Sequence, residues 1–273
     1  ERHARLGEEG EQQLQLLVGE DTFRNGMRTY LTTYQFANAT WPNLIDILDG
    51  LSDEDLKTWS EVWVEEPGRP TVQTTIEADA QNVIRELRLE QTDPDEKGRI
   101  WNQRLTLALA YPESSWTIEA KLDASRVTIE SAAGRPAPDY VLANGAGVGY
   151  GLFRLDPASR TYLLEHMTNI EEPMHRGIGW VTLREEMLEG DVAAEDLLTL
   201  GVQALAIETD QLIIQRIIGT INSAYWRYIT SDIRRQWAPR LERLFREKLD
   251  QAQTISLRAT YFNGFRSVVL SDA

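Results

Sequence analysis

The fold is decided by one stretch, residues 14–70, which reads LQLLVGEDTFRNGMRTYLTTYQFANATWPNLIDILDGLSDEDLKTWSEVWVEEPGRP. Apolar residues recur three or four positions apart from Phe23 to Tyr34, a spacing typical of one face of an amphipathic helix. Thr40 is predicted to cap a second helix that carries Pro42 in its first turn, and Gly50 is predicted to end it. The stretch therefore begins with at least two short helices.

A third helix follows within the same stretch. Ser52 is predicted to cap it, because an acidic residue stands three positions later, at Asp55. Its buried stripe would consist of Leu56, Trp59, Val62 and Trp63. Tryptophans at helical spacing are typical of core anchors, so no ligand platform is expected here.

Residues 67–143 change to a period of two, which is typical of half-buried strands. The alternating segments are 72–76, 83–89, 105–109, 116–120 and 127–129. Turn sequences separate them, among them Asp93-Pro94-Asp95-Glu96-Lys97-Gly98 and Gly134-Arg135-Pro136. Six or seven short strands without a helix between them predict a small antiparallel β-sandwich.

Residues 144–273 return to helical periodicity. Asp191 and Asp210 are predicted to cap helices that run to Leu200 and Ile221. Helices of this length with short joints favour a helical array. The predicted fold class is therefore α+β multidomain, with helices over 1–66, a β-sandwich over 67–143 and an α-helical array over 144–273.

Composition excludes several classes of protein. The chain has 273 residues, a formal net charge of −15 and no cysteine, so disulfides and thiolate metal sites are excluded. The acidity argues against nucleic acid as a partner. No apolar run approaches the roughly 20 residues that a membrane span needs. A soluble protein is expected, and no compartment is assigned.

The first stretch also resembles a known family. The residues that carry the resemblance are Gly19-Glu20-Asp21, Phe23, Gly26-Met27, Tyr30-Leu31, Phe36, Asn38-Ala39, Leu44, Trp63, Gly68 and Pro70. In this order they resemble the end of the catalytic domain in gluzincin zinc aminopeptidases, which include membrane alanyl aminopeptidase and the antigen-trimming aminopeptidases. A second patch, residues 142–156, resembles the segment of that family that leaves the sandwich and enters the helical domain. Arg176 and Glu208, each expected within a helix, resemble weaker family positions.

The resemblance implies a layout and an activity. The family has a helical tail of the catalytic domain, then a small sandwich, then a large helical C-terminal domain. It implies that the parent protein is a metallopeptidase that binds zinc and releases N-terminal amino acids from peptides. The chain would be the downstream part of this hydrolase, and its partners would be the missing catalytic domain and the peptide substrate.

The residues that perform this chemistry are not found in the sequence. Zinc hydrolysis in this family needs a His-Glu-x-x-His helix, whereas the chain has only His3, His166 and His175. Pro173 lies between the last two, so one helix cannot present both to a metal. The family's substrate-binding glycine–methionine motif is missing, and residues 1–11 carry no tyrosine for an oxyanion. We therefore expect no catalytic residue, no metal ligand and no cofactor in this chain.

One basic region holds aromatic residues between arginines, from Arg227 to Lys248. Such residues could stack on bases, but interleaved acidic residues favour an amphipathic, salt-bridged helix. In the family, the concave side of the helical domain can supply basic groups to the far end of a peptide. Arg234, Arg235 and Arg240 are the candidate peptide-contacting residues.

Two other patterns are assigned structural roles. The glycine-rich segment 145–151 has Tyr150 where a dinucleotide loop needs its third glycine, so it is predicted to be a turn from the sandwich into the helices. The acidic pairs Glu65-Glu66 and Glu185-Glu186 are predicted to be solvated, because helical neighbours point about 100° apart.

Two hypotheses remain. In the first, the chain is the non-catalytic C-terminal region of a zinc metalloaminopeptidase and acts as a support and as the lid of the substrate chamber. In the second, it belongs to a non-enzymatic scaffold, a pseudo-peptidase that binds peptides or proteins. An intact His-Glu-x-x-His in the polypeptide upstream of residue 1 would favour the first, and its loss would favour the second.

Overall fold

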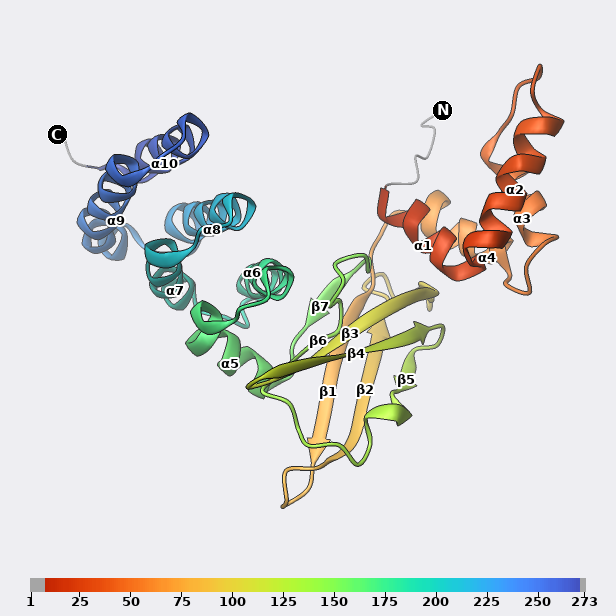
Figure 1. Cartoon of the computed structure of the whole chain (residues 1–273), viewed down its shortest axis with the longest axis horizontal. Coiled ribbons are helices and arrows are strands. Elements are labelled where there is room, and N and C mark those ends of the chain that lie inside the picture. Colours follow the sequence, from red (N-terminus) through yellow and green to blue (C-terminus); the bar gives the residue numbers. More distant parts are fainter. Residues whose placement is uncertain (1–7, 271–273) are drawn as a thin grey trace. The chain divides into compact units, whose positions relative to one another are not determined.

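The computed structural model describes residues 8–270. Contacts divide the chain into two compact units, the first ending at Asp156 and the second beginning at Pro157. Helices open the first unit, two sheets complete it, and helices alone form the second (Figure 1). The predicted α+β multidomain class is thus confirmed at this level. Over residues 8–270, no helix combines the length and the apolar character needed to cross a bilayer.

The first unit begins with short helices around a small apolar core. These elements are α1 (Glu8–Val18), α2 (Glu20–Thr33), α3 (Trp41–Asp49), α4 (Leu56–Ser60) and the π-helical turn η1 (Glu61–Glu65). Their core consists of Leu14, Leu17, Ile45, Leu48, Leu56 and Trp59. Gly26 of α2 lies against α3, where a Cβ atom would stand 2.3 Å from the Leu48 side chain. The close approach of α2 and α3 therefore requires a glycine.

The predicted caps of this region are partly correct. Asn43 Oδ1 accepts hydrogen bonds from the amide and the hydroxyl of Thr40, at 3.1 and 2.7 Å, and Gly50 ends α3. The predicted cap at Ser52 is wrong. Asp55 caps α4 by accepting a hydrogen bond from the Thr58 amide (3.0 Å), whereas the Ser52 hydroxyl accepts one from an amide two residues later.

Two sheets follow, and their facing sides form one core. The strands are β1 (Thr71–Ala78), β2 (Ile84–Thr92), β3 (Gln103–Tyr111), β4 (Ser114–Leu122), β5 (Arg126–Thr128), β6 (Tyr140–Leu142) and β7 (Leu152–Arg154), with a 3-10 turn η2 (Glu130–Ala132). Their orders are β5-β2-β1-β7 and β4-β3-β6. The core draws on both sheets through Val72, Leu87, Leu89, Leu105, Leu107, Leu109 and Ile118.

Pairing confirms the strand periodicity and adds one strand. Leu89 pairs with Thr74 across β1–β2, and Leu107 pairs with Ile118 across β3–β4, both antiparallel. β7 instead pairs parallel with β1, from Thr71 opposite Leu152 to Gln73 opposite Arg154. It lies beyond residue 143, where the sequence places the end of the sandwich.

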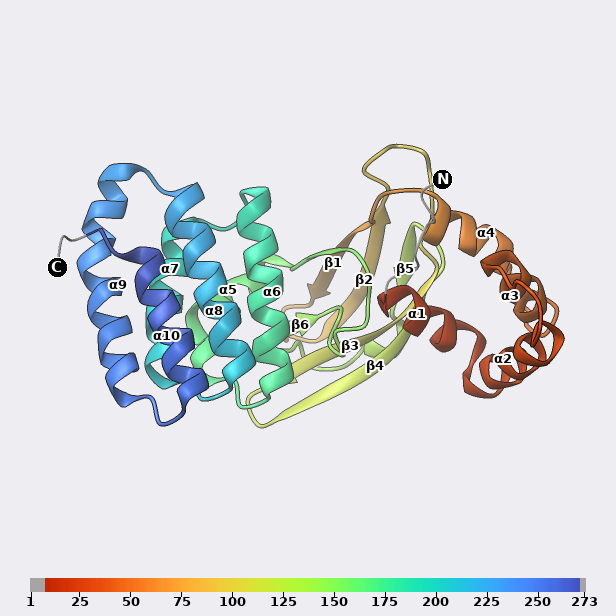
Figure 2. The ribbon, with the colours of Figure 1, turned by 90° about the horizontal axis from the view of Figure 1, so that it is seen from above.

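The second unit consists of helices that pack side by side (Figure 2). They are α5 (Pro157–His166), η3 (Met167–Asn169), α6 (Pro173–Glu189), α7 (Ala194–Ile207), α8 (Gln211–Ser223), the π-helical turn η4 (Ala224–Tyr228), α9 (Ser231–Gln251) and α10 (Ile255–Val268). The core includes Trp180, Leu183, Leu197, Leu205, Ile217, Tyr225, Leu241 and Phe245.

Of the two helix caps predicted in this unit, the one at Asp210 is correct and the one at Asp191 is wrong. The Asp210 carboxylate accepts hydrogen bonds from the amides of Leu212 (2.8 Å) and Ile213 (3.0 Å), as predicted for α8. The prediction for Asp191 is wrong, because Ala193 occupies the N-cap position of α7. The Asp191 amide donates to the carbonyl of Glu186 (2.8 Å) and so belongs to the turn that ends α6.

Candidate functional site

The first candidate from the sequence, Arg234, supports the backbone of its own unit. Its guanidinium donates to the carbonyls of Tyr225 (2.7 Å), Trp226 (3.0 Å) and Ile229 (3.3 Å). These carbonyls end the π-helical turn η4, where the helix leaves acceptors without partners of its own. The guanidinium carbon also lies 4.7 Å from the centre of the Trp226 ring. Arg234 is therefore engaged in fixing η4 against α9.

The other two predicted basic residues make local contacts on α9. Arg235 forms an exposed ion pair with Asp232, one turn earlier. The guanidinium of Arg240 lies 5.0 Å from the centre of the Trp237 ring. All the contacts recorded for these three arginines fall within residues 225–240, and their role in peptide contact stays a prediction.

The histidines do not offer a metal site. His166 ends α5 and makes a tilted ring contact with Tyr162, with ring centres 4.8 Å apart. His175 is buried in α6, and burial lowers its pKa although Glu172 opposes the shift. Within residues 8–270, no cluster of three or more His, Asp or Glu side chains could hold an ion. The described residues therefore do not fit the zinc that the family resemblance implies, and His3 lies outside them.

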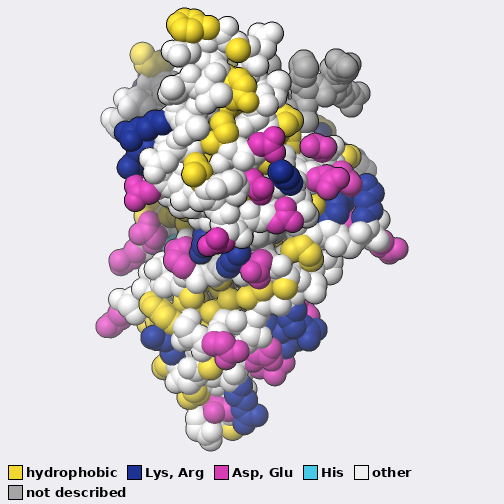
Figure 3. All heavy atoms as spheres, turned by 90° about the vertical axis from the view of Figure 1, so that its right-hand side faces the viewer, with side chains coloured by type: hydrophobic (Ala, Val, Ile, Leu, Met, Phe, Trp, Pro, Cys, Tyr) yellow, Lys and Arg dark blue, Asp and Glu magenta, His cyan; other side chains and the backbone are white. Residues whose placement is uncertain are grey.

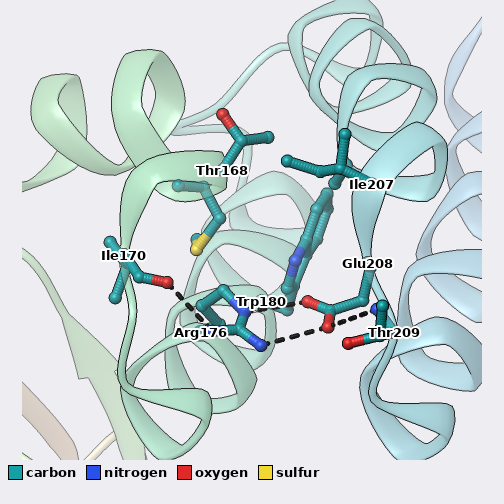
Figure 4. A pocket seen from close by; sticks show the side chains of 9 residues that line it. Thr168, Ile170, Arg176, Trp180, Ile207, Glu208 and Thr209 are labelled. Atoms are coloured by element: carbon teal, nitrogen blue, oxygen red, sulfur yellow. Dashed lines mark hydrogen bonds and ion pairs between the residues drawn. The ribbon is translucent and has the colours of Figure 1, made fainter.

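A small pocket in the second unit contains the two residues that resemble weaker family positions. Its volume is about 200 Å³. Figure 4 shows the carboxylate of Glu208 facing the guanidinium of Arg176 next to Trp180. The complete lining consists of Met167, Thr168, Ile170, Arg176, Trp180, Ala204, Ile207, Glu208 and Thr209. Glu208 lies between α7 and α8 rather than within a helix, which corrects the expectation from the sequence.

The two residues of this pair are partly buried, and both make several hydrogen bonds. Arg176 Nε and Nη2 donate to Glu208 at 2.8 and 3.0 Å, while Nη1 donates to the carbonyls of Ile170 and Glu171. Glu208 also accepts from the amides of Thr209 and Asp210, both at 2.9 Å. Burial alone would raise the pKa of Glu208, but these hydrogen bonds lower it overall. The pair thus clamps the start of α6 to the α7–α8 joint.

A second buried carboxylate contradicts the prediction for the acidic pairs. Glu186 is fully buried, and its oxygens accept from Arg160 Nε (2.8 Å) and Nη2 (2.9 Å). Its neighbour Glu185 lies near Arg184, at 3.6 Å. The solvated interpretation is wrong for Glu186, because two adjacent helical residues point apart and only one of them faces the core.

Buried amide side chains hold the glycine-rich segment of the first unit. Gln103 accepts from the amide of Tyr150 (2.9 Å) and donates to its carbonyl (3.0 Å). Gln13 of α1 accepts from the Arg104 amide (2.8 Å) and donates to the carbonyls of Arg104 and Val148. The segment joins β6 to β7, so the predicted direct turn into the helices is wrong. Sequence reasoning missed both glutamines, since nothing local distinguishes a buried amide.

An arginine cluster orders the loop between β2 and β3. Arg99 is buried and donates to Asp93 at 2.7 and 2.9 Å and to Asp95 at 2.8 Å. It also bonds the Pro67 carbonyl (2.7 Å) and lies 4.6 Å from the centre of the Trp101 ring. The guanidinium holds the pKa of Asp93 well below its usual range, against the opposing effect of burial. We therefore assign this cluster a structural role, which is to hold the loop between β2 and β3 in place.

Comparisons with known proteins show that the chain is similar in sequence to several aminopeptidases. It is 25% identical to aminopeptidase N of Streptomyces lividans over 228 residues, which cover 79% of this chain and 27% of that protein. It is 28% identical to aminopeptidase N of Lactobacillus helveticus over 116 residues, which cover 42% of this chain and 14% of that protein. No family model matches.

A solved structure has the same fold. The aminopeptidase A of Legionella pneumophila, determined in complex with aspartic acid, superposes with a TM-score of 0.55 and 13% identity. The match covers 93% of this chain and 34% of that one. The matches thus span about a third or less of the length of each of these proteins. The resemblance to aminopeptidases inferred from the sequence is confirmed.

Proposed function

We propose that this chain, which is similar to aminopeptidases in sequence and fold, is the non-catalytic C-terminal region of a zinc metalloaminopeptidase. The whole protein would release N-terminal amino acids from peptides. In it, residues 14–66 would form the helical end of the catalytic domain, followed by the sandwich and the helical array. The chain would support the catalytic domain and cover the substrate chamber.

The length of the similarity to the Streptomyces protein carries this proposal. Because 79% of 273 residues is about 216, any continuous match of that size includes residues 58–216. This range contains the whole sandwich and crosses into the second unit. A single shared domain would not extend so far, so the similarity favours a shared order of domains.

The chemistry would come from polypeptide outside this chain. The sequence has no His-Glu-x-x-His, the arrangement that presents two imidazoles and a carboxylate on one helical face. We therefore assign no catalytic step to residues of this chain. Its contribution would be the placement of the domain that carries the metal.

Exposed apolar side chains on the N-terminal helices and on the turns that follow α2 and α3 support a docking role. Phe36 is 95% exposed and Leu31 is 62% exposed, and Leu16 and Leu51 are also open to solvent. Figure 3 shows exposed hydrophobic side chains on this face of the molecule, interspersed with polar and charged ones. Exposed apolar patches are typical of interaction sites, and the proposal assigns these side chains to contact with the missing catalytic domain.

Complementation tests the proposal. The upstream polypeptide of the same protein and the 273-residue chain would be produced separately and mixed. We expect binding, and chelator-sensitive release of N-terminal amino acids from the mixture but not from this chain alone. Phe36→Asp should weaken the binding, whereas Ile255→Asp, which alters an equally exposed apolar residue on α10, should not. Binding without peptide hydrolysis would support the pseudo-peptidase scaffold, and no binding would contradict both.

A further inference from the structure

A second hollow in the helical unit is lined by arginines. We call it the arginine pocket, and define it by Arg184, Gly219, Asn222, Ser223, Trp226 and Arg227. Its volume is about 380 Å³. It shares no residue with the Arg176–Glu208 pocket and none with the peptide-contacting candidates of α9.

Three elements of the second unit build the arginine pocket, and α7 separates the first of them from the other two along the chain. Arg184 comes from α6, the last turns of α8 supply Gly219, Asn222 and Ser223, and η4 supplies the remaining two residues. A Cβ atom at Gly219 would meet nothing within 4 Å, so this wall of the pocket is open. The π-helical turn matters because it continues α8 with altered spacing and so brings Trp226 and Arg227 beside the last turn of α8.

The charge of the lining is opposite to that of the whole chain. The formal net charge is −15, yet the lining holds two guanidinium groups and no carboxylate. Arg227 is exposed and has no hydrogen-bond or ion-pair partner among residues 8–270. Arg184 has one recorded ion pair, to Glu185 Oε1 at 3.6 Å, in which the two side chains are 39% and 20% exposed, and solvent-accessible pairs contribute little. Both guanidinium groups thus remain available to a ligand.

The remaining walls are fixed by hydrogen bonds. Asn222 Oδ1 is bonded to Ser267 Oγ at 2.6 Å, while its amide nitrogen has no recorded partner in the described part of the chain. Trp226 Nε1 donates to the Ser267 carbonyl (2.6 Å), and Arg234 covers the ring from 4.7 Å. The Asn222 amide, whose side chain is held in this way, should therefore lose little freedom when a ligand binds, which favours affinity.

We propose that the arginine pocket binds a small oxyanion, through a carboxylate or a phosphate group. A guanidinium presents paired N–H donors in one plane, and this geometry matches two oxygens of either group. Arg184 and Arg227 would hold the anion, and the Asn222 amide would donate a further hydrogen bond. This site goes beyond the proposed function, because it requires neither zinc nor the catalytic domain.

Titration of the 273-residue chain tests the proposal. Succinate and inorganic phosphate are the two probes, added at constant ionic strength and followed by calorimetry and by the arginine Nε–Hε signals in NMR spectra. We expect saturable binding of at least one probe at millimolar concentration, and the stronger probe identifies the group that the pocket takes. The absence of saturable binding of both probes overturns the proposal.

Matched variants locate the binding. Arg227→Gln should weaken it about tenfold, the effect of losing one charge-assisted hydrogen-bonding partner. Arg243→Gln also removes an exposed arginine without a recorded partner, on α9, and should leave the affinity unchanged. Equal effects of the two substitutions, or none, would overturn the assignment.

A filled pocket gives an independent check that keeps both charges. Gly219→Leu adds a side chain where no atom stands within 4 Å of its Cβ position, and leucine is a better helix former than glycine. Circular dichroism should show an intact fold, and binding of the probe should be lost. Undiminished binding in this folded variant would contradict the location.

Discussion

The clamp between Arg176 and Glu208 gives a quantitative prediction for Glu208→Gln. The Glu208 side chain is 6% exposed and accepts two hydrogen bonds from Arg176, whose side chain is 15% exposed. Removing one partner of a buried ion pair costs about 3–5 kcal/mol. Glutamine retains one acceptor oxygen, and Arg176 keeps two backbone carbonyls. We therefore expect a loss at or just below the lower end of this range, about 2–3 kcal/mol in the free energy of unfolding of the second unit.

The pH dependence of this loss has a definite sign. The folded-state pKa of Glu208 is lowered, so its ionised form stabilises the fold. That contribution is complete above the unfolded pKa, about 4.3, and disappears as the pH falls through the lower folded value. Because Glu208→Gln resembles the protonated side chain, the difference between the two proteins should narrow below pH of about 4.3.

Urea unfolding combined with hydrogen exchange measures this effect. Exchange of the amides in α6 and α8 assigns the change to the second unit. Glu20→Gln serves as the control, because it removes an exposed carboxylate that pairs with Arg24, and it should cost at most about 0.5 kcal/mol. A loss below about 1 kcal/mol for Glu208→Gln would refute the clamp, since buried pairs cost more than that to break. So would a difference that stays constant down to pH of about 3, well below the usual pKa of a glutamate.

Three further predictions concern other parts of the chain. Gln103→Leu leaves the amide and the carbonyl of Tyr150 unpaired. It should lower the free energy of unfolding of the first unit by about 2–3 kcal/mol in urea unfolding. The control Gln81→Leu, at an exposed position, should change this free energy by at most about 0.5 kcal/mol. Gly26→Ala would place a methyl group 2.3 Å from the side chain of Leu48 on α3, and it should destabilise the first unit by about 1–3 kcal/mol. In the control Gly219→Ala the new methyl group meets no atom within 4 Å, and this change should stabilise α8 by about 0.5–1 kcal/mol. The pKa of His175 is lowered in the folded state. Its neutral form therefore stabilises the fold fully above about pH 6.5, and this contribution is lost as the pH falls through the lower folded pKa. His175→Asn should remove this part of the pH dependence of the melting temperature.

Each of these three predictions can fail. If Gln103→Leu and Gln81→Leu lower the free energy of unfolding equally, the hydrogen bonds of the buried Gln103 amide do not stabilise the first unit. A stable Gly26→Ala variant would show that α2 and α3 can separate without cost. If His175→Asn loses stability at acid pH in the same way as the unmodified chain, that loss would come from carboxylates alone.

The strands could be predicted because burial alternates along them. From β1 to β4, residues with period two face a common core, and the sequence records that pattern directly. β7 was not predicted, because three residues are too few to show a period of two. Its parallel partner β1 is also distant in sequence, since the paired residues Thr71 and Leu152 are 81 positions apart. A strand of this kind is set by tertiary pairing and not by local preference.

Buried polar contacts were the main failure of sequence reasoning. Arg176 and Glu208 are separated by 32 positions, and Gln13 and Arg104 by 91, so no local pattern joins them. The adjacent Glu185 and Glu186 look alike in sequence, yet the partner that buries Glu186 lies on α5. Caps were predictable where the side chain immediately precedes the helix, as at Asp210, and not where a turn intervenes, as at Asp191.

The most direct test of the central claim is a peptide-hydrolysis assay of the whole protein that contains this chain. Release of N-terminal amino acids would be measured with and without a zinc chelator, beside the 273-residue chain alone. We predict chelator-sensitive release by the whole protein and none by the chain. Turnover by the chain alone, or a whole protein without activity, would contradict the account.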